Sequence, residues 1–505
     1  MSTSADDSPA RRIMALYLAT GLALVVLLML VGVLMRMSQA GWIRLTSVDF
    51  YALMTLHGAG MIAALVLCGM GGIWYLIRRE VAMAASLALW SYGVTVGGVL
   101  LVAVAAAFGK FGAAWTFLYP LPFLNPTWPA WSIGTFLIGL TLITLGWSAW
   151  CIQVLEAVLR GFGGFRGVLG IDAVLRPKAF ALSGRKLPPP QVLPAFVIAF
   201  DGLLAAAAAS LLGVALFVHW LDPAVPLDAL WAKNITYFFG HDLANFIIYM
   251  LIAQVYVGLP AYTRRPWKNS TILTLGWWGT LVFLLLAFPH HLYMDFAQPV
   301  WIQYLGLGAS YLSSVPVAVV TVFGGLLLVW RSGMRWGLGS LFMYAGMAGW
   351  ILGGIGALLD ATIHFNIHLH NTLWVPAHFH TYLLGASFLF ALGWVFAMLE
   401  ARSQDPTRPA MRWAIGVTVL GGIALLVATF YVAGAASVPR RYDVEPDPGP
   451  LLAGWGSVGA IVLLIGLAIA TVEGARLWRG LRRTRTAIEW PWSPEQATQP
   501  GGGAR

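Results

Sequence analysis

Long apolar stretches separated by short polar connections make up almost the whole chain. A helix needs about 20 mostly apolar residues to span a bilayer, and twelve stretches reach that length. They are residues 13–37, 51–77, 84–109, 129–159, 192–220, 233–257, 271–292, 302–330, 336–363, 372–399, 410–434 and 452–478. The pattern predicts an all-α integral membrane protein. Its twelve transmembrane helices form one bundle within residues 1–483, and a disordered tail follows at 484–505.

The composition and the placement of charge support this topology. Hydrophobic residues make up 59% of the chain and charged residues 10%, whereas soluble proteins carry about 25% charged residues. With the N-terminus inside, 24 of the 30 Lys and Arg residues fall in inner connections and six in outer ones. Because cytoplasmic connections are enriched in Lys and Arg, we expect both termini in the cytoplasm. The net charge of +10 therefore reflects topology and not nucleic-acid binding.

Two further features narrow the class of protein. The connection at 160–191 is basic and ends in a proline run, which predicts a cytoplasmic loop. The only two cysteines, Cys68 and Cys151, lie in apolar stretches. A disulfide framework and a zinc motif are both excluded by this count and placement.

Histidines gather at one depth of the predicted bundle. Six of the ten fall in the outer third of four predicted helices, namely His57, His241, His290, His291, His378 and His380. An ionisable side chain inside a span marks a functional site by default, and neutral imidazole is a ligand for copper, zinc and iron. A single histidine of this kind is usually a satisfied core residue, but six at one level predict a metal centre.

The spacing of these histidines predicts how they are shared between metals. Residues two apart on an α-helix point about 200° apart, so His378 and His380 face opposite sides of one helix and can bind two different haems. A low-spin haem needs two axial ligands, and His57 with His380 is the natural pair. His378 then holds a second haem alone. The adjacent His290 and His291 can both reach one metal, and His241 completes a three-imidazole copper site.

Five motifs carry a resemblance that covers essentially the whole chain. They are LHGAG with His57, GHDLANF with His241, PHHLYMD with His290 and His291, HNTLWVPAHFH with His370, His378 and His380, and SVPRRYD with Arg440 and Arg441. With these motifs the chain resembles subunit I of the haem–copper oxidase superfamily, the cytochrome c oxidase family. It looks most like the ba-type (B family) oxidases and the nitric oxide reductases that resemble them.

The resemblance implies a role for each motif residue. His57 and His380 resemble the low-spin haem ligands, and His378 resembles the high-spin haem ligand. The copper ion, CuB, would be held by His241, His290 and His291. Arg440 and Arg441 resemble the pair that binds haem propionates, as suits the bidentate pairing of guanidinium with carboxylate. The implied cofactors are two haems and one copper ion. We expect His370 and Asn366 to join a polar network above the haems.

One position departs from the oxygen-reducing members of the resembled family. In A- and B-type oxygen reductases a tyrosine follows the first copper histidine by four residues and supplies an electron and a proton. Here that position is Asn245, whose amide cannot supply a redox equivalent, and Tyr249 is about 12 Å from His241 along the helix axis. Nitric oxide reductases lack this tyrosine. With no glutamate on the neighbouring spans, we expect copper rather than iron at the three imidazoles.

Two activities follow from this departure. The favoured one is reduction of nitric oxide to nitrous oxide at a high-spin haem/CuB site that includes Asn245. The alternative is reduction of dioxygen to water with proton translocation, as in a cytochrome c oxidase. A non-redox carrier would have no need for six aligned histidines. Protons would reach the site over a hydroxyl path through Tyr249, Thr280 and the segment YLSSVPVAVVT.

The chain contains no ligand set for CuA and no CxxCH haem-attachment motif. The resemblance therefore implies a small subunit II that carries CuA or a c-type haem, and a cytochrome c-like electron donor. We expect the complex in the bacterial cytoplasmic (inner) membrane, with the metal sites toward the outer side.

Overall fold

The structure is a computed structural model that describes residues 8–114, 125, 127–400 and 406–484, and within them it is a bundle of helices without a strand. Eleven of these helices are long and apolar enough to cross a membrane. They are α1 (Ser8–Gln39), α2 (Ser47–Arg78), α3 (Ala85–Ala107), α4 (Ala130–Gly161), α8 (Val192–Leu221), α9 (Ala229–Thr263), α11 (Val300–Val329), α12 (Leu338–Ala361), the continuous α14–η2–α15 segment (Trp374–Glu400), α16 (Pro409–Ala435) and α17 (Gly449–Thr484). The predicted tail beyond Thr484 lies outside the described residues.

The twelfth predicted span, 271–292, is not one continuous helix. The helix α10 covers Thr271–Phe283, and the chain then tightens into turns and the 3₁₀ helix η1 (Phe288–Leu292). Here hydrogen bonds between residues three apart in the sequence replace the four-apart bonds of an α-helix. One example runs from the His290 N–H to the Ala287 carbonyl at 3.2 Å. Pro289 has no N–H to donate and cannot continue an α-helix. The tight turn brings both histidines of η1 to the end of the helix.

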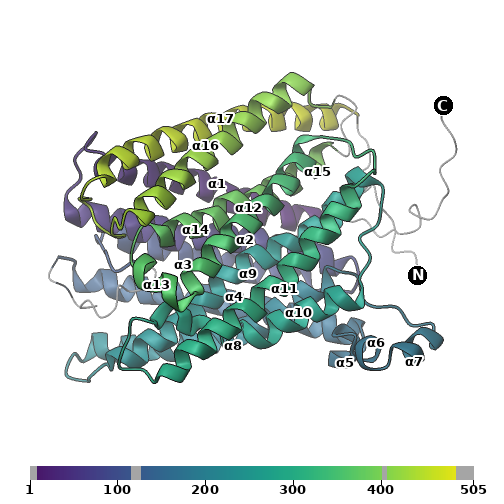
Figure 1. Ribbon diagram of the computed structural model, residues 1–505, viewed down its shortest axis with the longest axis horizontal. Coiled ribbons are helices and arrows are strands. Elements are labelled where there is room, and N and C mark those ends of the chain that lie inside the picture. Colours follow the sequence, from purple (N-terminus) through teal and green to yellow (C-terminus); the bar gives the residue numbers. More distant parts are fainter. Residues whose placement is uncertain (1–7, 115–124, 126, 401–405, 485–505) are drawn as a thin grey trace.

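Shorter helices fill two connections. The predicted loop at 160–191 folds into α5 (Gly164–Val168), α6 (Ile171–Leu175) and α7 (Pro177–Leu182). The seven-residue α13 (Ile363–Leu369) leads into the motif HNTLWVPAHFH. Figure 1 shows α16 and α17 along one side of the bundle, α8 and α10 along the other, and α2, α9 and α14 between them.

The centre of the bundle is formed by the helices that carry the histidines. The most apolar 18-residue window is entirely buried in α2 and largely buried in α9 and in the segment Trp374–Glu400. The last segment comprises α14 (Trp374–Tyr382), a π-helical turn η2 (Leu383–Phe388) and α15 (Leu389–Glu400). A π turn is a frequent feature beside functional sites, and this one begins three residues after His380. The outer helices instead expose large apolar side chains, as a bundle surrounded by lipid does.

Candidate metal centre

Three imidazoles converge where α9 meets η1. One ring nitrogen from each of His241, His290 and His291 lies within 4.8 Å of the other two. The Nδ1 of His241 is 3.2 Å from the Nε2 of His291, and the rings of His290 and His291 are 4.0 Å apart between centroids. Three imidazoles without a thiolate or a carboxylate form a donor set suited to copper.

A hydrogen bond with Ser310 determines which ring nitrogen of His290 carries the hydrogen. Its Nδ1 lies 2.9 Å from the Ser310 Oγ, while that hydroxyl donates its own hydrogen to the Gly306 carbonyl at 2.6 Å. The Ser310 oxygen must then accept from His290, so Nδ1 carries the hydrogen. The Nε2 lone pair of His290 is left free for a metal, an arrangement typical of imidazole ligands.

A second pair of imidazoles lies between α2 and α14. The rings of His57 and His380 are nearly parallel, 16° apart, with centroids at 6.2 Å. The Nδ1 of His57 is 2.8 Å from the Leu28 carbonyl, and the Nδ1 of His380 is 2.7 Å from the Pro376 carbonyl. A carbonyl only accepts hydrogen bonds, so each Nδ1 is protonated and each Nε2 lone pair can bind iron.

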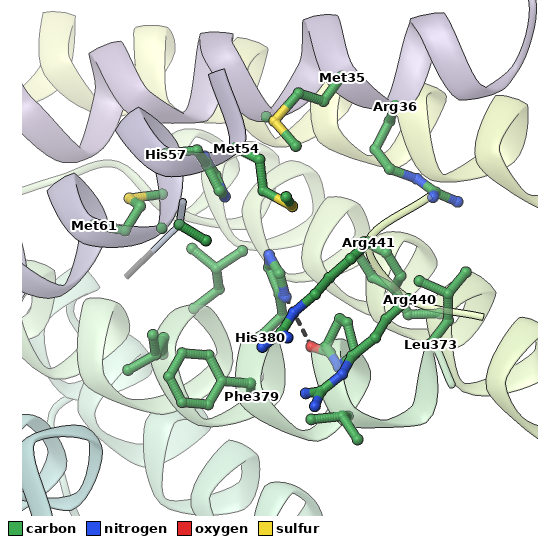
Figure 2. A pocket seen from close by; sticks show the side chains of 18 of the residues that line it. Met35, Arg36, Met54, His57, Met61, Leu373, Phe379, His380, Arg440 and Arg441 are labelled. Carbon is green, nitrogen blue, oxygen red and sulfur yellow. Dashed lines mark hydrogen bonds between the residues drawn. The ribbon is translucent and has the colours of Figure 1, made fainter. Parts of the chain in front are cut away.

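Two cavities lie between these groups, and His241, His291 and His378 border both. The first cavity is lined by His57, His378, His380, Arg440 and Arg441 among others, and Figure 2 shows His57 and His380 pointing toward each other with Arg441 beside them. The second cavity is lined by the three converging imidazoles, His378 and Asn245, but not by His380. His380 thus borders only the first of these two cavities, whereas His378 borders both.

The Asn245 amide lies directly beside the three imidazoles. Its Nδ2 donates to the His241 carbonyl at 2.9 Å and lies 3.4 Å from the His241 Nε2. Tyr249 is one turn further along α9, where its hydroxyl is 3.3 Å from the Ser314 Oγ. Tyr249 is not among the residues that line the second cavity, so the phenol does not take the place that Asn245 occupies.

Comparisons with known proteins agree with this geometry. The sequence model of the family described as "Cytochrome C and Quinol oxidase polypeptide I" matches residues 12–467. The chain belongs to the haem–copper oxidase subunit I family.

Individual relatives are distant but span most of the chain. The cytochrome c oxidase subunit 1 of Synechocystis sp. is 23% identical over 457 residues, 87% of this chain and 79% of that protein. The alternative cytochrome c oxidase subunit 1 of Bradyrhizobium diazoefficiens is 24% identical over 506 residues, 90% of this chain and 80% of that protein. A solved haem–copper terminal oxidase dimer matches with a TM-score of 0.74 at 19% identity, over 93% of this chain and 84% of that one, and shows the shared fold.

Membership of the haem–copper oxidase family implies haems and copper, and the residues present fit them. The fully buried Nδ1 of His378 has no hydrogen-bond partner among the described residues, and its Nε2 is 3.7 Å from the Asp360 Oδ2. A buried imidazole without a satisfied nitrogen is costly unless another group binds it. Because the Nδ1 atoms of His57 and His380 are protonated, the Nε2 lone pair of each ring is free for a haem iron.

The arginine pair of this family member is held rigidly above the first cavity. Arg440 donates from Nη2 to the Asn371 Oδ1 at 2.9 Å and from its backbone N–H to the Asn371 carbonyl at 2.8 Å. The Arg441 side chain bonds to Tyr237. Burial, with a smaller contribution from the charge of Arg440, lowers the pKa of Arg441 to about 10. Arg441 therefore stays cationic at neutral pH, and two adjacent half-buried cations favour an anionic group such as a haem carboxylate.

The outer polar network is partly as expected. The Asn366 Nδ2 donates to the Asp360 carbonyl at 2.6 Å, and His370 lies close enough to Arg440 that burial and this charge lower the pKa of His370 to about 4. Asp360 is the member that the sequence analysis missed. It is buried and lines the second cavity beside His378, so an aspartate, although no glutamate of the described residues, lies next to the site. Its position at the end of a predicted span was the available signal.

Two other neighbours of the site, Tyr237 and Asp242, were not predicted from the sequence. Tyr237, one turn before His241 on α9, stacks on the His291 ring at 5.1 Å and 21°. Asp242, next to His241, is fully buried, and neither carboxylate oxygen has a hydrogen-bond partner in the described part of the chain. For Asp242 a signal exists, because this acidic residue lies in the motif GHDLANF inside a predicted span. The contact of Tyr237 depends on the position of η1, which no local pattern reveals.

Glycines hold space for the histidines, and one offers a test. A Cβ on Gly32 of α1 would come within 2.8 Å of the His57 Cε1. We expect Gly32→Ala to tilt the His57 ring at a cost of about 0.5–1.5 kcal/mol, and thus to shift the optical absorption of the low-spin haem and weaken its retention. Gly97→Ala on α3, where nothing lies within 4 Å, is the matched control. An unchanged spectrum in Gly32→Ala would show that His57 is not a haem ligand.

Proposed function

We propose that the chain is the catalytic subunit I of a membrane-bound haem–copper oxidoreductase that reduces nitric oxide to nitrous oxide. The observation that carries this proposal is the Asn245 amide, 3.4 Å from His241 where a redox-active phenol would be needed to split dioxygen. The reaction is 2 NO + 2 e⁻ + 2 H⁺ → N₂O + H₂O. It needs two electrons and two protons, and no side chain has to be oxidised.

In this proposal the histidines divide as their geometry suggests. His57 and His380 hold the low-spin haem, His378 holds the high-spin haem, and Arg440 and Arg441 bind haem propionates. The three converging imidazoles hold CuB. When bound, these groups supply the electrons and the positions at which NO is held.

The chain's own residues deliver and orient the substrate. The second cavity extends from the imidazoles between α11 and α12, where its walls are apolar, with Val319, Phe323, Ile351 and Ile355. A small gas that partitions into lipid can reach the site through such walls. At the inner end, Asn245 offers amide hydrogen-bonding groups to the bound nitrogen oxide, while the apolar walls limit the access of water.

Protons are proposed to arrive over hydroxyls that the structure brings together. Ser313 and Ser314 line the second cavity, and their Oγ atoms are 3.3 Å apart. The Tyr249 hydroxyl is 3.3 Å from the Ser314 Oγ. About two helical turns further along α9, the Tyr256 hydroxyl is 2.6 Å from the Thr321 Oγ1. Thr280 hydrogen-bonds the Tyr249 side chain and also donates to the Ser313 carbonyl at 2.7 Å. These contacts support a path from the side opposite the arginine pair.

The remaining parts of the proposal concern the assembly. Electrons come from a small subunit II with CuA or a c-type haem and from a cytochrome c-like donor. The complex lies in the bacterial inner membrane with both termini in the cytoplasm and the metal sites near the outer side. These assignments rest on the distribution of Lys and Arg and on the missing donor motifs.

Gas turnover by the purified, reduced complex tests the activity directly. NO and dioxygen are supplied separately with the same electron donor, and N₂O is measured as the product. We expect fast NO loss to N₂O and slow oxygen uptake. The relatives named cytochrome c oxidase favour the alternative, reduction of dioxygen to water. Fast oxygen uptake with negligible NO turnover would establish that alternative and refute the proposed one.

Substitutions at Asn245 separate the two activities. We expect Asn245→Leu to lower kcat/KM for NO about tenfold, the equivalent of one lost hydrogen bond of about 1.4 kcal/mol. Asn245→Tyr restores a phenol beside His241 and should raise oxygen uptake relative to NO turnover. Stopped-flow consumption of each gas measures both effects. If Asn245→Leu keeps full NO activity, the amide takes no part in the reaction.

A further inference from the structure

The segment 162–188, referred to below as the basic segment, carries charge that the proposed activity does not use. It contains five Lys and Arg residues and one acidic residue, Asp172. Asp172 is already shared, since Arg166 donates to its Oδ1 at 2.5 Å and Arg185 to its Oδ2 at 3.0 Å. The other three cations, Arg176, Lys178 and Lys186, have no carboxylate within salt-bridge distance among the described residues.

The same segment exposes large apolar side chains. Leu182 is 90% exposed and Leu175 is 68% exposed. This exposure does not come from a loosely attached loop, because Val168 and Ala173 of the basic segment are buried. The segment is also fastened to the bundle by two hydrogen bonds, from the Trp278 Nε1 to the Leu169 carbonyl and from the Asn269 Nδ2 to the Pro188 carbonyl, both at 2.9 Å. A fixed surface thus presents leucines and cations together.

The position of the basic segment indicates what covers it. Figure 1 shows α5, α6 and α7 at the end of the bundle, beyond the neighbouring ends of α8 and α10. On α10, which Trp278 ties to the segment, Ile272 is 67% exposed and Leu275 is 46% exposed. Exposed apolar side chains are thus found both on this apolar helix and on the segment that Trp278 ties to it.

We propose that the basic segment is a lipid-binding surface that takes anionic phospholipid. Leu175 and Leu182 enter the acyl region near the headgroups, and Arg176, Lys178 and Lys186 pair with the phosphate groups. Combined apolar and basic surfaces bind at the membrane interface by this division of labour, and cations near an anionic leaflet are attracted over about one Debye length. The proposal is independent of which gas the enzyme reduces.

The depth of Leu182 is the first test. The two native cysteines are buried, so Leu182→Cys in the full complex can be labelled selectively with an environment-sensitive fluorophore. In nanodiscs of phosphatidylcholine and phosphatidylglycerol, we expect a spin label near the lipid headgroup to quench the fluorophore at least twofold, and aqueous iodide to quench it weakly. Strong iodide quenching without lipid quenching would overturn the proposal. Protection from both quenchers would show a protein partner on this surface, which also overturns it.

The preference for anionic lipid is the second test. Electron paramagnetic resonance measures the immobilised fractions of spin-labelled phosphatidylglycerol and phosphatidylcholine on the complex. We expect the double variant Arg176→Gln/Lys178→Gln to lose about half of the preference for phosphatidylglycerol. Arg44→Gln, which removes one positive charge at the opposite end of the bundle, should leave the preference unchanged. Equal preferences in all three proteins, or equal immobilisation of the two lipids on the native complex, would refute the proposal. Loss of the preference on adding inorganic phosphate alone would show a free-anion site instead of a lipid site.

Discussion

Replacing His290 by alanine is expected to remove copper from the complex and to lower gas turnover at least about 100-fold. Loss of a neighbouring group that only orients a metal ligand costs 10–100-fold in affinity or activity, and loss of the ligand itself costs more. The Nε2 of His290 is the nitrogen left free by the hydrogen bond of its Nδ1 with Ser310. Removing it leaves two imidazoles, too few to hold the ion.

Copper content by mass spectrometry and haem content by optical spectroscopy measure the effect of His290→Ala. Both haems should remain, because His57, His378 and His380 are untouched. Ser310→Ala should reduce copper retention by a smaller factor, since it removes only the acceptor of the Nδ1 hydrogen. His219→Ala is the matched control, because His219 is only half-buried and bonds only to the Val225 carbonyl in the described structure. Full copper content in His290→Ala would contradict the three-imidazole site.

Much of this centre could be predicted from the sequence because its ligands follow local rules. Apolar length located eleven of the twelve expected spans as long helices, and the two-residue spacing of His378 and His380 is in keeping with only His378 of the two bordering the second cavity. The exception, 271–292, shows the limit of that reasoning. Apolar composition does not reveal that α10 stops at Phe283 and that tight turns carry the chain to His290. The backbone there is shaped by Pro289 and by the packing of η1 on α11.

The neighbours of the ligands could not be predicted because they come from distant parts of the chain. Asp360 reaches His378 from the end of α12, and Tyr237 reaches His291 across the gap between α9 and η1. The loop that carries Arg440 is placed by Asn371, 69 positions away in the sequence. No periodicity encodes such contacts. They depend on helix packing, and they decide which nitrogen of each imidazole is free.

Substituting His378 and His380 separately is expected to remove two different haems. His380 lies against the first cavity, parallel to His57, whereas His378 also borders the second cavity with the three imidazoles. His380→Ala should lose the low-spin haem and keep copper and a haem that binds carbon monoxide. His378→Ala should lose the carbon monoxide-binding haem and keep the low-spin spectrum. Turnover should fall at least about 100-fold in both, since either loss interrupts the transfer of electrons to the gas.

Haem extraction and carbon monoxide difference spectra distinguish these outcomes, and Phe379→Leu provides the control. Phe379 lies between the two histidines and lines both cavities without offering a nitrogen, so this variant should keep both haems. Loss of the same haem in His378→Ala and His380→Ala would mean that the two imidazoles serve one iron. The division of the site would then be wrong. His57 and His380 would not form a separate pair beside a centre of four histidines, His241, His290, His291 and His378.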